Sequence, residues 1–219
     1  MSSSSNKKQL KGFTKLRKEW IEPILIAFIL AFLIRTFLFQ PFKIPSSSME
    51  DTLLVGDHLV AMKFLYGSKI PFTDKRILKI RDPKPGDVIV FKYPEDPSKD
   101  FIKRCIAIGG QTIEIKNKKV YVDGELQELP GHAKIVEKTV YPARFGPRDN
   151  YSRFEVPSGT AFVMGDNRDN SNDSRYWGTV PYENIKGKAF MLYWSWNRES
   201  KVYDIVHRIR WSRFFALIR

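Results

Sequence analysis

The sequence is poor in cysteine and histidine. It has one cysteine, Cys105, in 219 residues, which excludes an intramolecular disulfide and so a small secreted scaffold held together by disulfides. Its three histidines, His58, His132 and His207, form no HExxH motif, and no CxxC or other metal-ligand spacing is present. We therefore expect neither a metal ion nor a cofactor.

Acidic residues are also in the minority. Asp and Glu number 24 against 37 Lys and Arg, which gives a formal net charge of +13. Such a charge suits a nucleic acid, an anionic membrane surface or an acidic substrate. Hydrophobic residues nevertheless make up 42% of the chain, a balance typical of a folded domain.

One long hydrophobic run, residues 20–39, follows a basic segment at residues 1–19. Twenty helical residues span about 30 Å, the thickness of the hydrocarbon core, so we expect one transmembrane helix here. A cleaved secretory signal fits less well because no small-x-small site follows the run. A buried core helix fits less well because of the flanking basic cluster.

The basic residues before the span also predict its orientation. The positive-inside rule makes residues 1–19 a cytoplasmic tail and places everything after residue 40 on the extracytoplasmic side of the plasma (inner) membrane. Because this topology separates the domain from most nucleic acid, we expect no nucleic-acid partner.

Beyond residue 40 the pattern predicts a mainly β fold. Residues 111–129 predict two hairpins, which turn at Asn117 and at Asp123-Gly124. We expect a main β domain, a small β-hairpin subdomain and a basic amphipathic C-terminal tail, which fits either a helix on a membrane surface or a helix that closes the domain. The predicted strands are 58–66, 86–93, 101–109, 159–167 and 188–196. The main β domain comprises residues 40–110 and 159–200, the hairpin subdomain residues 111–158, and the C-terminal tail residues 201–219.

Three serines, Ser46, Ser47 and Ser48, follow Pro45 directly after the hydrophobic run. Pro45 restricts its own backbone and that of the residue before it, so these serines lie on a stiff turn just outside the membrane. A serine needs a base to act as a nucleophile at neutral pH. His58, next to Asp57, is one candidate, but strand alternation points these two side chains to opposite faces. A solvated strand histidine is the simpler interpretation.

Lys103 is the other candidate base. It interrupts the apolar strand at 101–109, with Phe101 and Cys105 as near neighbours on its own face. A lysine acts as a base only when its pKa falls well below about 10.4, and burial among apolar groups lowers that pKa. Most lysines in strands point to water, so this residue alone is a weak indication.

Three motifs occur in the order found in bacterial signal peptidase I, a family of membrane-anchored proteases with a serine–lysine dyad. PSSSMEDTLLVGD (45–57) resembles the family's serine motif PxxSMxPTLxxGD, and GDVIVFKYPEDPSKDFIKR (86–104) resembles its lysine motif. GDNRDNSNDSRYWG (165–178) is similar to its third and most specific motif. The resemblance runs from about residue 20 to the last tryptophan-containing segment.

This resemblance implies a role for each matching residue. Ser48 would be the nucleophile, Lys103 the general base and Ser46 an oxyanion donor beside the Ser48 backbone N–H. Ser171 would hydrogen-bond and orient the lysine. The residues expected to brace the site are Asp166, Asp173 and Arg175, with Arg104 as the usual neighbour of the lysine.

The resemblance also implies shallow apolar pockets for small substrate side chains at P1 and P3, and an exposed strand edge on which an extended substrate pairs. Ordinary core packing is the competing interpretation for each residue expected in the pockets. Those residues are Phe42, Ile44, Met49, Leu53, Phe91, Phe101, Ile102 and Met164.

The sequence departs from the family pattern at a few points. Asp51 stands where the family usually has proline, and Ser47 where glycine is frequent. The cysteine pair of some members is absent, and one span precedes the serine motif instead of two. The expected general base is a lysine, whereas the endoplasmic-reticulum relatives of the family have a histidine in that role.

The implied function is a membrane-bound serine endopeptidase that removes signal peptides from exported preproteins after small residues at −1 and −3. Membrane lipids would be further partners, and the oligomeric state is not specified. Two alternatives remain: a specialised processing peptidase of the same superfamily, and an inactive membrane-tethered β module that binds exported proteins or anionic lipids. A self-cleaving repressor would need a helix-turn-helix where residues 1–40 have a membrane span.

Overall fold

A long apolar helix leads into the folded domain. The computed structural model describes residues 17–71, 73, 75–197 and 208–218. The helix runs from Arg17 to Leu38, with π-helical pairing at Arg17–Ile21 (η1) and Ile34–Leu38 (η2) around the α-helix Glu22–Leu33 (α2). Its most apolar stretch has a mean hydropathy of 2.2 and no buried residue. The expectation of a helix of membrane-spanning length is thus confirmed.

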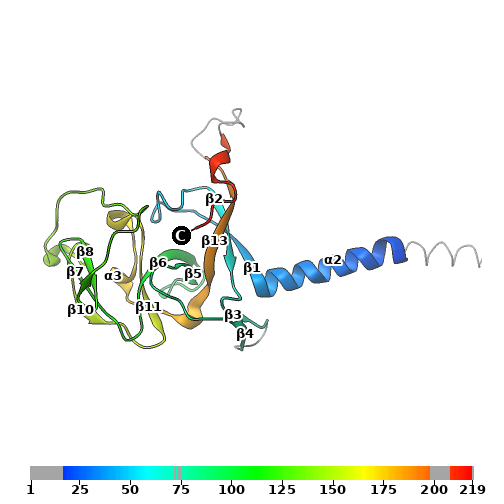
Figure 1. Cartoon of the computed structure of the whole chain (residues 1–219), viewed down its shortest axis with the longest axis horizontal. Helices are drawn as coiled ribbons and strands as arrows, with labels where there is room; N and C mark the ends of the chain where they lie inside the picture. The colour runs from blue at the N-terminus through cyan, green and yellow to red at the C-terminus, as the bar shows by residue number, and fades with distance from the viewer. Residues whose placement is uncertain (1–16, 72, 74, 198–207, 219) are drawn as a thin grey trace, which may run out of the picture.

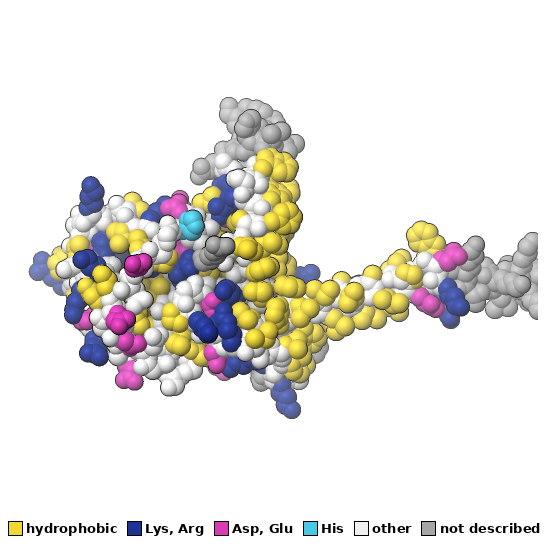
Figure 2. Space-filling model, in the orientation of Figure 1, with side chains coloured by type: hydrophobic (Ala, Val, Ile, Leu, Met, Phe, Trp, Pro, Cys, Tyr) yellow, Lys and Arg dark blue, Asp and Glu magenta, His cyan; other side chains and the backbone are white. Residues whose placement is uncertain are grey.

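The helix stands apart from the β-strands. Figure 1 shows α2 projecting away from the domain, and Figure 2 shows hydrophobic side chains along its visible face. At about 1.5 Å per residue, its 22 residues extend about 33 Å. A helix with so much exposed apolar surface requires a nonpolar environment, which a bilayer supplies.

The main sheet has seven strands, and every neighbouring pair in it is antiparallel. The fold is therefore mainly β, as the sequence predicts. The strand order is β1-β2-β13-β5-β6-β11-β12, so strands distant in the chain lie side by side. The bounds are Phe39–Lys43 (β1), Asp57–Met62 (β2), Val88–Lys92 (β5), Asp100–Ile108 (β6), Thr160–Met164 (β11), Val180–Pro181 (β12) and Ile185–Ser195 (β13).

One predicted strand is wrong in extent. Residues 58–66 do not form a single strand, because the chain leaves the main sheet after Met62. The Lys63 amide donates to the Leu38 carbonyl at the end of the helix, and the Tyr66 amide donates back to the Lys63 carbonyl. The chain then enters a separate hairpin, Tyr66–Lys69 (β3) with Arg76–Lys79 (β4). The predicted strand is thus divided by the contact with the helix.

A second sheet of four strands lies at the end of the domain opposite α2 (Figure 1). Both predicted hairpin turns are confirmed: Asn117 and Lys118 have positive φ, as do Asp123 and Gly124, which is typical of tight two-residue turns. The strands fall inside the predicted 111–158 subdomain, although the division into subdomains stays a prediction. They are Thr112–Lys116 (β7), Lys119–Val122 (β8), Glu125–Leu126 (β9) and Tyr151–Glu155 (β10).

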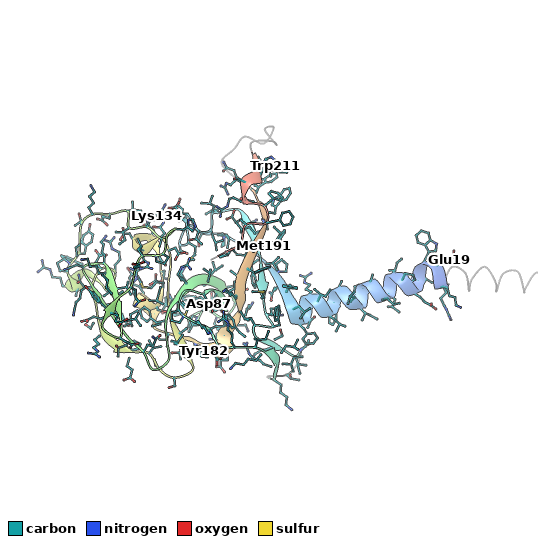
Figure 3. All side chains as sticks on the ribbon, in the orientation of Figure 1. Glu19, Asp87, Lys134, Tyr182, Met191 and Trp211 are labelled. Atoms are coloured by element: carbon teal, nitrogen blue, oxygen red, sulfur yellow. The ribbon has the colours of Figure 1, made fainter. Side chains whose placement is uncertain are left out.

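The C-terminal segment differs from the amphipathic helix expected for 201–219. Of this segment, residues 201–207 and 219 lie outside the described part. Residues 208–218 run back along β13 as isolated bridges, Trp196 with Ile209 and Met191 with Leu217, around a short 3-10 turn at Trp211–Arg213 (η6). Met191 and Trp211 are labelled in Figure 3. The side chain of Ile218 is buried in the core, and this packing replaces the helix.

Candidate active site

The serine turn begins where β1 ends. The Ile44 amide donates to the Asp57 carbonyl, and the Gly56 amide donates to the Ile44 carbonyl, so the two ends of the turn are held together. Met49 and Leu53 point into the core and are fully buried. Ser48 therefore lies on a loop whose ends are hydrogen-bonded to each other and whose apolar side chains pack into the core.

The structure brings Ser48 and Lys103 together. Lys103 lies in β6, and its Nζ is 2.5 Å from Ser48 Oγ, although 55 residues separate the two in the chain. Both side chains are buried, with 8% of Ser48 and 4% of Lys103 exposed. The Ser46 hydroxyl lies 3.4 Å from Ser48 Oγ. The structure thus places the Lys103 amine and the Ser46 hydroxyl within 3.4 Å of Ser48 Oγ.

Burial changes the acid–base properties of Lys103. Desolvation lowers the pKa of the ammonium group from 10.5 to about 8. The Asp173 carboxylate opposes this decrease, Arg175 adds to it, and Asp166 again opposes it. The face of the Phe101 ring, 5.5 Å from Nζ, supplies part of the apolar surroundings. With a pKa of about 8, roughly one amine in ten is neutral at pH 7 and half are neutral at pH 8, whereas a solvated lysine is almost entirely charged at both values.

The loop after β11 holds the serine turn from the other side. The Asn167 amide donates to the Ser48 carbonyl (3.1 Å), and its side-chain nitrogen donates to the Ser47 carbonyl (3.2 Å). Thr52 Oγ1 donates to Asp166 at 2.6 Å. Asn167 and Thr52 were not singled out from the sequence, because their role depends on contacts between segments more than 110 residues apart.

Two buried ion pairs support this loop. Arg104 donates two hydrogen bonds to Asp166, at 2.8 and 2.7 Å, and both side chains are almost completely buried. Asp173 accepts from the Arg175 guanidinium at 2.8 and 2.9 Å and from the Gly165 amide at 3.0 Å. All four predicted bracing residues therefore surround the site. Breaking either pair would leave an uncompensated buried charge, so both pairs stabilise the conformation of the loop.

A cavity of about 320 Å³ opens beside the Ser48–Lys103 pair. Phe101 and Ile102 are the two predicted pocket residues that line it. Phe42 is half-buried against the core, and the other predicted pocket residues are buried: Ile44, Met49, Leu53, Phe91 and Met164. Their contact with a substrate stays a prediction. The cavity's remaining lining residues are Pro45, Ser46, Ser47, Ser48, Asp100, Lys103, Asn170 and Asn172.

Most of the chain matches a known protein family. Residues 17–194 match the family described as "Signal peptidase, peptidase S26". That stretch covers the helix, the serine turn and the whole loop after β11.

The chain belongs to the signal peptidase family, peptidase S26.

Curated relatives agree. The chain is 39% identical over 218 residues to signal peptidase I of Pseudomonas aeruginosa, covering 83% of this chain and 76% of that protein. It is 38% identical to signal peptidase I of Aquifex aeolicus, covering 82% and 85%. It is also 41% identical to the probable signal peptidase I-1 of Synechocystis, covering 83% and 84%. As a member of the signal peptidase family, the chain is a protease, and hence a hydrolase.

Ser171 does not make the hydrogen bond that the resemblance to signal peptidases implied. Its hydroxyl is buried, yet it has no hydrogen-bond partner among the residues that the structure describes. Gly165 explains how closely the loop approaches the serine turn here. A Cβ on Gly165 would overlap Ser171 Oγ and the Ser48 carbonyl oxygen, and it would lie 2.6 Å from Ser171 Cβ. This position therefore admits glycine alone.

The Asp51 departure from the signal peptidase pattern has a structural counterpart. Asp51 has a φ of 75°, a value that the ring of proline forbids. Its carboxylate is 3.1 Å from Lys134 Nζ, and Glu50 is 3.2 Å from the same amine. Lys134, labelled in Figure 3, thus ties the segment after β9 to the serine turn. The serine turn of this chain is held by an ion pair where the family pattern has proline.

His58, the alternative base, is half-buried on β2. Its Nδ1 is buried and has no hydrogen-bond partner among the described residues, so the side chain is only partly solvated. Its neighbour Asp57 is bound by Arg213 and Ser195. Among the described residues, no group of three His, Cys, Asp or Glu side chains is placed to hold a metal ion.

The C-terminal segment supports the serine turn of this signal peptidase through Asp57. Arg213 donates to the fully buried Asp57 carboxylate at 3.2 and 2.7 Å and to the Thr52 carbonyl at 2.9 Å. Arg210 donates to the Val55 carbonyl at 3.0 Å. The C-terminal segment therefore holds the residues that lead from the serine turn to β2.

We expect Arg213→Leu to reduce the free energy of unfolding by about 2 kcal/mol, since the charged hydrogen bonds to a buried carboxylate are lost. The turn that carries Ser48 should loosen as well, which lowers kcat. Urea unfolding of the purified chain measures the first effect, and a peptidase assay measures the second. Arg153→Leu, on exposed β10, is the matched control and should change stability by less than about 0.5 kcal/mol. An equal loss of unfolding free energy in the two variants would contradict a stabilising role for the contact between Arg213 and Asp57.

Proposed function

We propose that this chain is a membrane-anchored serine endopeptidase that removes signal peptides from exported preproteins after small residues at −1 and −3. Ser48 is the nucleophile and Lys103 the general base. The observation that carries the proposal is the 2.5 Å distance between Lys103 Nζ and Ser48 Oγ inside a buried site. The names of the curated relatives, signal peptidase I, supply the substrate class.

In the first half of the reaction, neutral Lys103 accepts the Ser48 hydroxyl proton as Oγ attacks the scissile carbonyl. The tetrahedral oxyanion receives hydrogen bonds from the Ser48 backbone N–H and the Ser46 hydroxyl. The Lys103 ammonium then returns its proton to the leaving amine, the N-terminus of the mature protein, and an acyl-enzyme ester on Ser48 remains.

In the second half, water attacks the ester carbonyl and gives its proton to Lys103. As this second tetrahedral intermediate collapses, the Lys103 ammonium returns the proton to the leaving Ser48 Oγ, which restores the hydroxyl and the neutral amine. The signal peptide leaves with a new carboxylic acid, which loses its proton to solvent. The cavity of about 320 Å³ beside the dyad is the place for the substrate residues next to the scissile bond.

The proposed location follows from the same features. The apolar helix crosses the plasma (inner) membrane once with the N-terminus in the cytoplasm, which places the β domain on the extracytoplasmic side. Apolar side chains are exposed on β13 and the C-terminal segment, as expected for a domain that rests on the bilayer. They include Phe190, Tyr193, Trp211 and Phe215. Figure 2 shows this apolar surface running from the helix along β13. Cleavage regions of exported preproteins emerge at that surface.

The test is cleavage of a preprotein by the full chain reconstituted in lipid vesicles. The native chain should release the mature protein after a small-x-small sequence, and Ser48→Ala should lower kcat/KM by about 10⁴-fold or more. The control is Ser98→Ala, at an exposed turn, which should cleave normally. Undiminished cleavage by Ser48→Ala would reject the mechanism, and no cleavage by the native chain would favour the inactive binding module. Cleavage of a single dedicated preprotein would favour the specialised processing peptidase.

A further inference from the structure

A second cavity, of about 160 Å³, lies where the apolar helix enters the β domain. Its walls come from β1, the β3–β4 hairpin, β5 and β13, on elements that the reaction at Ser48 does not use. Five cationic side chains line it against one carboxylate, Glu183. The cations are Lys63, Lys69, Arg76, Lys92 and Lys186.

The positive charge of this basic cavity is only partly compensated. Lys186 pairs with Asp100 at 2.7 Å, and the Arg76 guanidinium donates to four backbone carbonyls, those of Tyr66, Gly67, Glu183 and Ile185. Lys63 Nζ has no ion-pair partner among the described residues. Burial lowers the pKa of Lys63, and the nearby charges of Lys186 and Arg76 lower it further. The site therefore concentrates positive charge that an anion would neutralise.

The basic cavity is also tied to the end of the helix. Gln40, which lines it, comes two residues after the helix ends at Leu38. The Lys63 amide donates to the Leu38 carbonyl, and the Ser68 hydroxyl donates to the Phe37 carbonyl. Two extended residues span about 7 Å, and the headgroup layer beside a core of about 30 Å is some 5–8 Å deep. If the helix spans the core, the basic cavity lies at the depth of lipid phosphates.

The hairpin beside the basic cavity exposes apolar side chains. Ile77 and Leu78 on β4 and Ile80 just after it are 38%, 52% and 65% exposed. These residues adjoin Arg76 in sequence, so the hairpin presents apolar and cationic groups together. Figure 1 places this hairpin beside the end of the helix. Apolar groups next to a phosphate-binding cavity suit a lipid, whose acyl chains need such contacts, better than a free phosphate ion.

We propose that the basic cavity binds the phosphate of an anionic phospholipid in the leaflet where the helix ends. The lipid phosphodiester accepts hydrogen bonds from Lys63 and Lys92, and its acyl chains lie against the hairpin and the last turn of the helix. Binding fixes the depth of the β domain relative to the bilayer. The inference depends on the proposed span of the membrane, but not on the chemistry at Ser48.

The test measures lipid binding directly, so it is independent of peptidase activity. The purified full chain in a neutral detergent is titrated with phosphatidylglycerol, phosphatidylcholine or glycerol phosphate, and bound lipid is counted by native mass spectrometry. Lys63→Gln with Lys92→Gln removes two charges without touching the backbone hydrogen bonds of Arg76. Lys119→Gln with Lys138→Gln removes two exposed lysines far from the basic cavity and is the matched control. Circular dichroism checks that both double variants fold.

The native chain and the control should each bind phosphatidylglycerol saturably. The Lys63 and Lys92 double variant should bind it at least roughly tenfold more weakly, because two charges next to the phosphate are lost. Equal affinity in both double variants would overturn the proposal, as would equal binding of phosphatidylcholine. Binding of glycerol phosphate as tight as that of phosphatidylglycerol would replace the lipid with a free phosphate site.

Discussion

Lys103→Met should abolish cleavage and at the same time stabilise the fold. Methionine has a similar length and no charge, so it fills the space beside Ser48 without the desolvation penalty of the ammonium group. Loss of the base should lower kcat/KM by about 10²- to 10⁴-fold. The same substitution should raise the free energy of unfolding near pH 6 by up to about 3 kcal/mol, the equivalent of a pKa decrease from 10.5 to about 8.

The pH dependence of this stabilisation follows from linkage. The folded-state pKa of Lys103 is lowered, so below about pH 8 the amine is protonated in both states and the folded state carries the full penalty. As pH rises from about 8 to 10.5, the folded amine is neutral while the unfolded amine remains charged, and the penalty disappears. The stability difference between Lys103→Met and the native chain should therefore shrink across that interval.

Urea unfolding of both proteins at pH 6 and pH 10 measures this difference. The control is Lys99→Met, four residues away on an exposed turn, which should cleave normally and show no stabilisation of this kind. A gain in stability that is equal at both pH values would contradict a buried amine that titrates near pH 8. Retained activity in Lys103→Met would contradict the base assignment.

Asp166→Ala should remove 3–5 kcal/mol of stability, about the largest effect available to a single substitution here. The carboxylate is fully buried, accepts two hydrogen bonds from Arg104 and one from Thr52, and its loss leaves the buried guanidinium without its counter-charge. For a chain of this size the melting temperature should fall by about 6–20 °C. Cleavage should fail at temperatures where the native chain is active, because the loop that holds Ser48 is released.

Two further variants separate the buried pair from ion pairs in general. Asp82→Ala breaks the half-exposed pair with Lys79 and should change stability by less than about 1 kcal/mol. Arg104→Met combined with Asp166→Leu removes both buried charges, and it should recover much of the stability that Asp166→Ala loses. A double variant as unstable as Asp166→Ala would show that the charge imbalance is not the cause.

Much of the candidate site was predictable from the sequence because its residues lie in short sequence motifs. Ser48, Lys103 and the loop containing Asp166 and Asp173 each belong to a separate motif, and the structure brings the three together. The strands at 86–93 and 101–109 were predictable from local β-branched and apolar patterns. In these cases the information lies within about ten consecutive residues.

The remainder depends on contacts between distant segments. Arg213 meets Asp57 across 156 residues, and Asn167 meets Ser47 across 120. Asn167 lies within the third motif, but no local pattern marks it as a partner of Ser47, and none marks Arg213. The C-terminal segment was predicted as an amphipathic helix from its basic and aromatic residues at helical spacing. For its described residues after Arg208, packing on β13 and on the buried Asp57 carboxylate determines a different path. Tertiary contacts override local propensity here.

The basic cavity illustrates the same limit. Lys63 directly follows β2 and Lys186 lies on β13, and an isolated lysine in a sequence predicts a solvated side chain. Only the meeting of these strands at the end of the helix creates a cluster of like charges. The net charge of +13 is therefore informative about function only once the positions of the charges are known.

The central claim is that burial lowers the pKa of the Lys103 amine far enough to supply a neutral amine beside Ser48. Its most direct test is an NMR titration of the chain labelled with ¹³C at lysine Cε, with the Lys103 signal assigned by its loss in Lys103→Met. A midpoint near pH 8, as burial of the ammonium group requires, is the expected result. A midpoint near 10.5, the value of a freely solvated lysine, would contradict the mechanism.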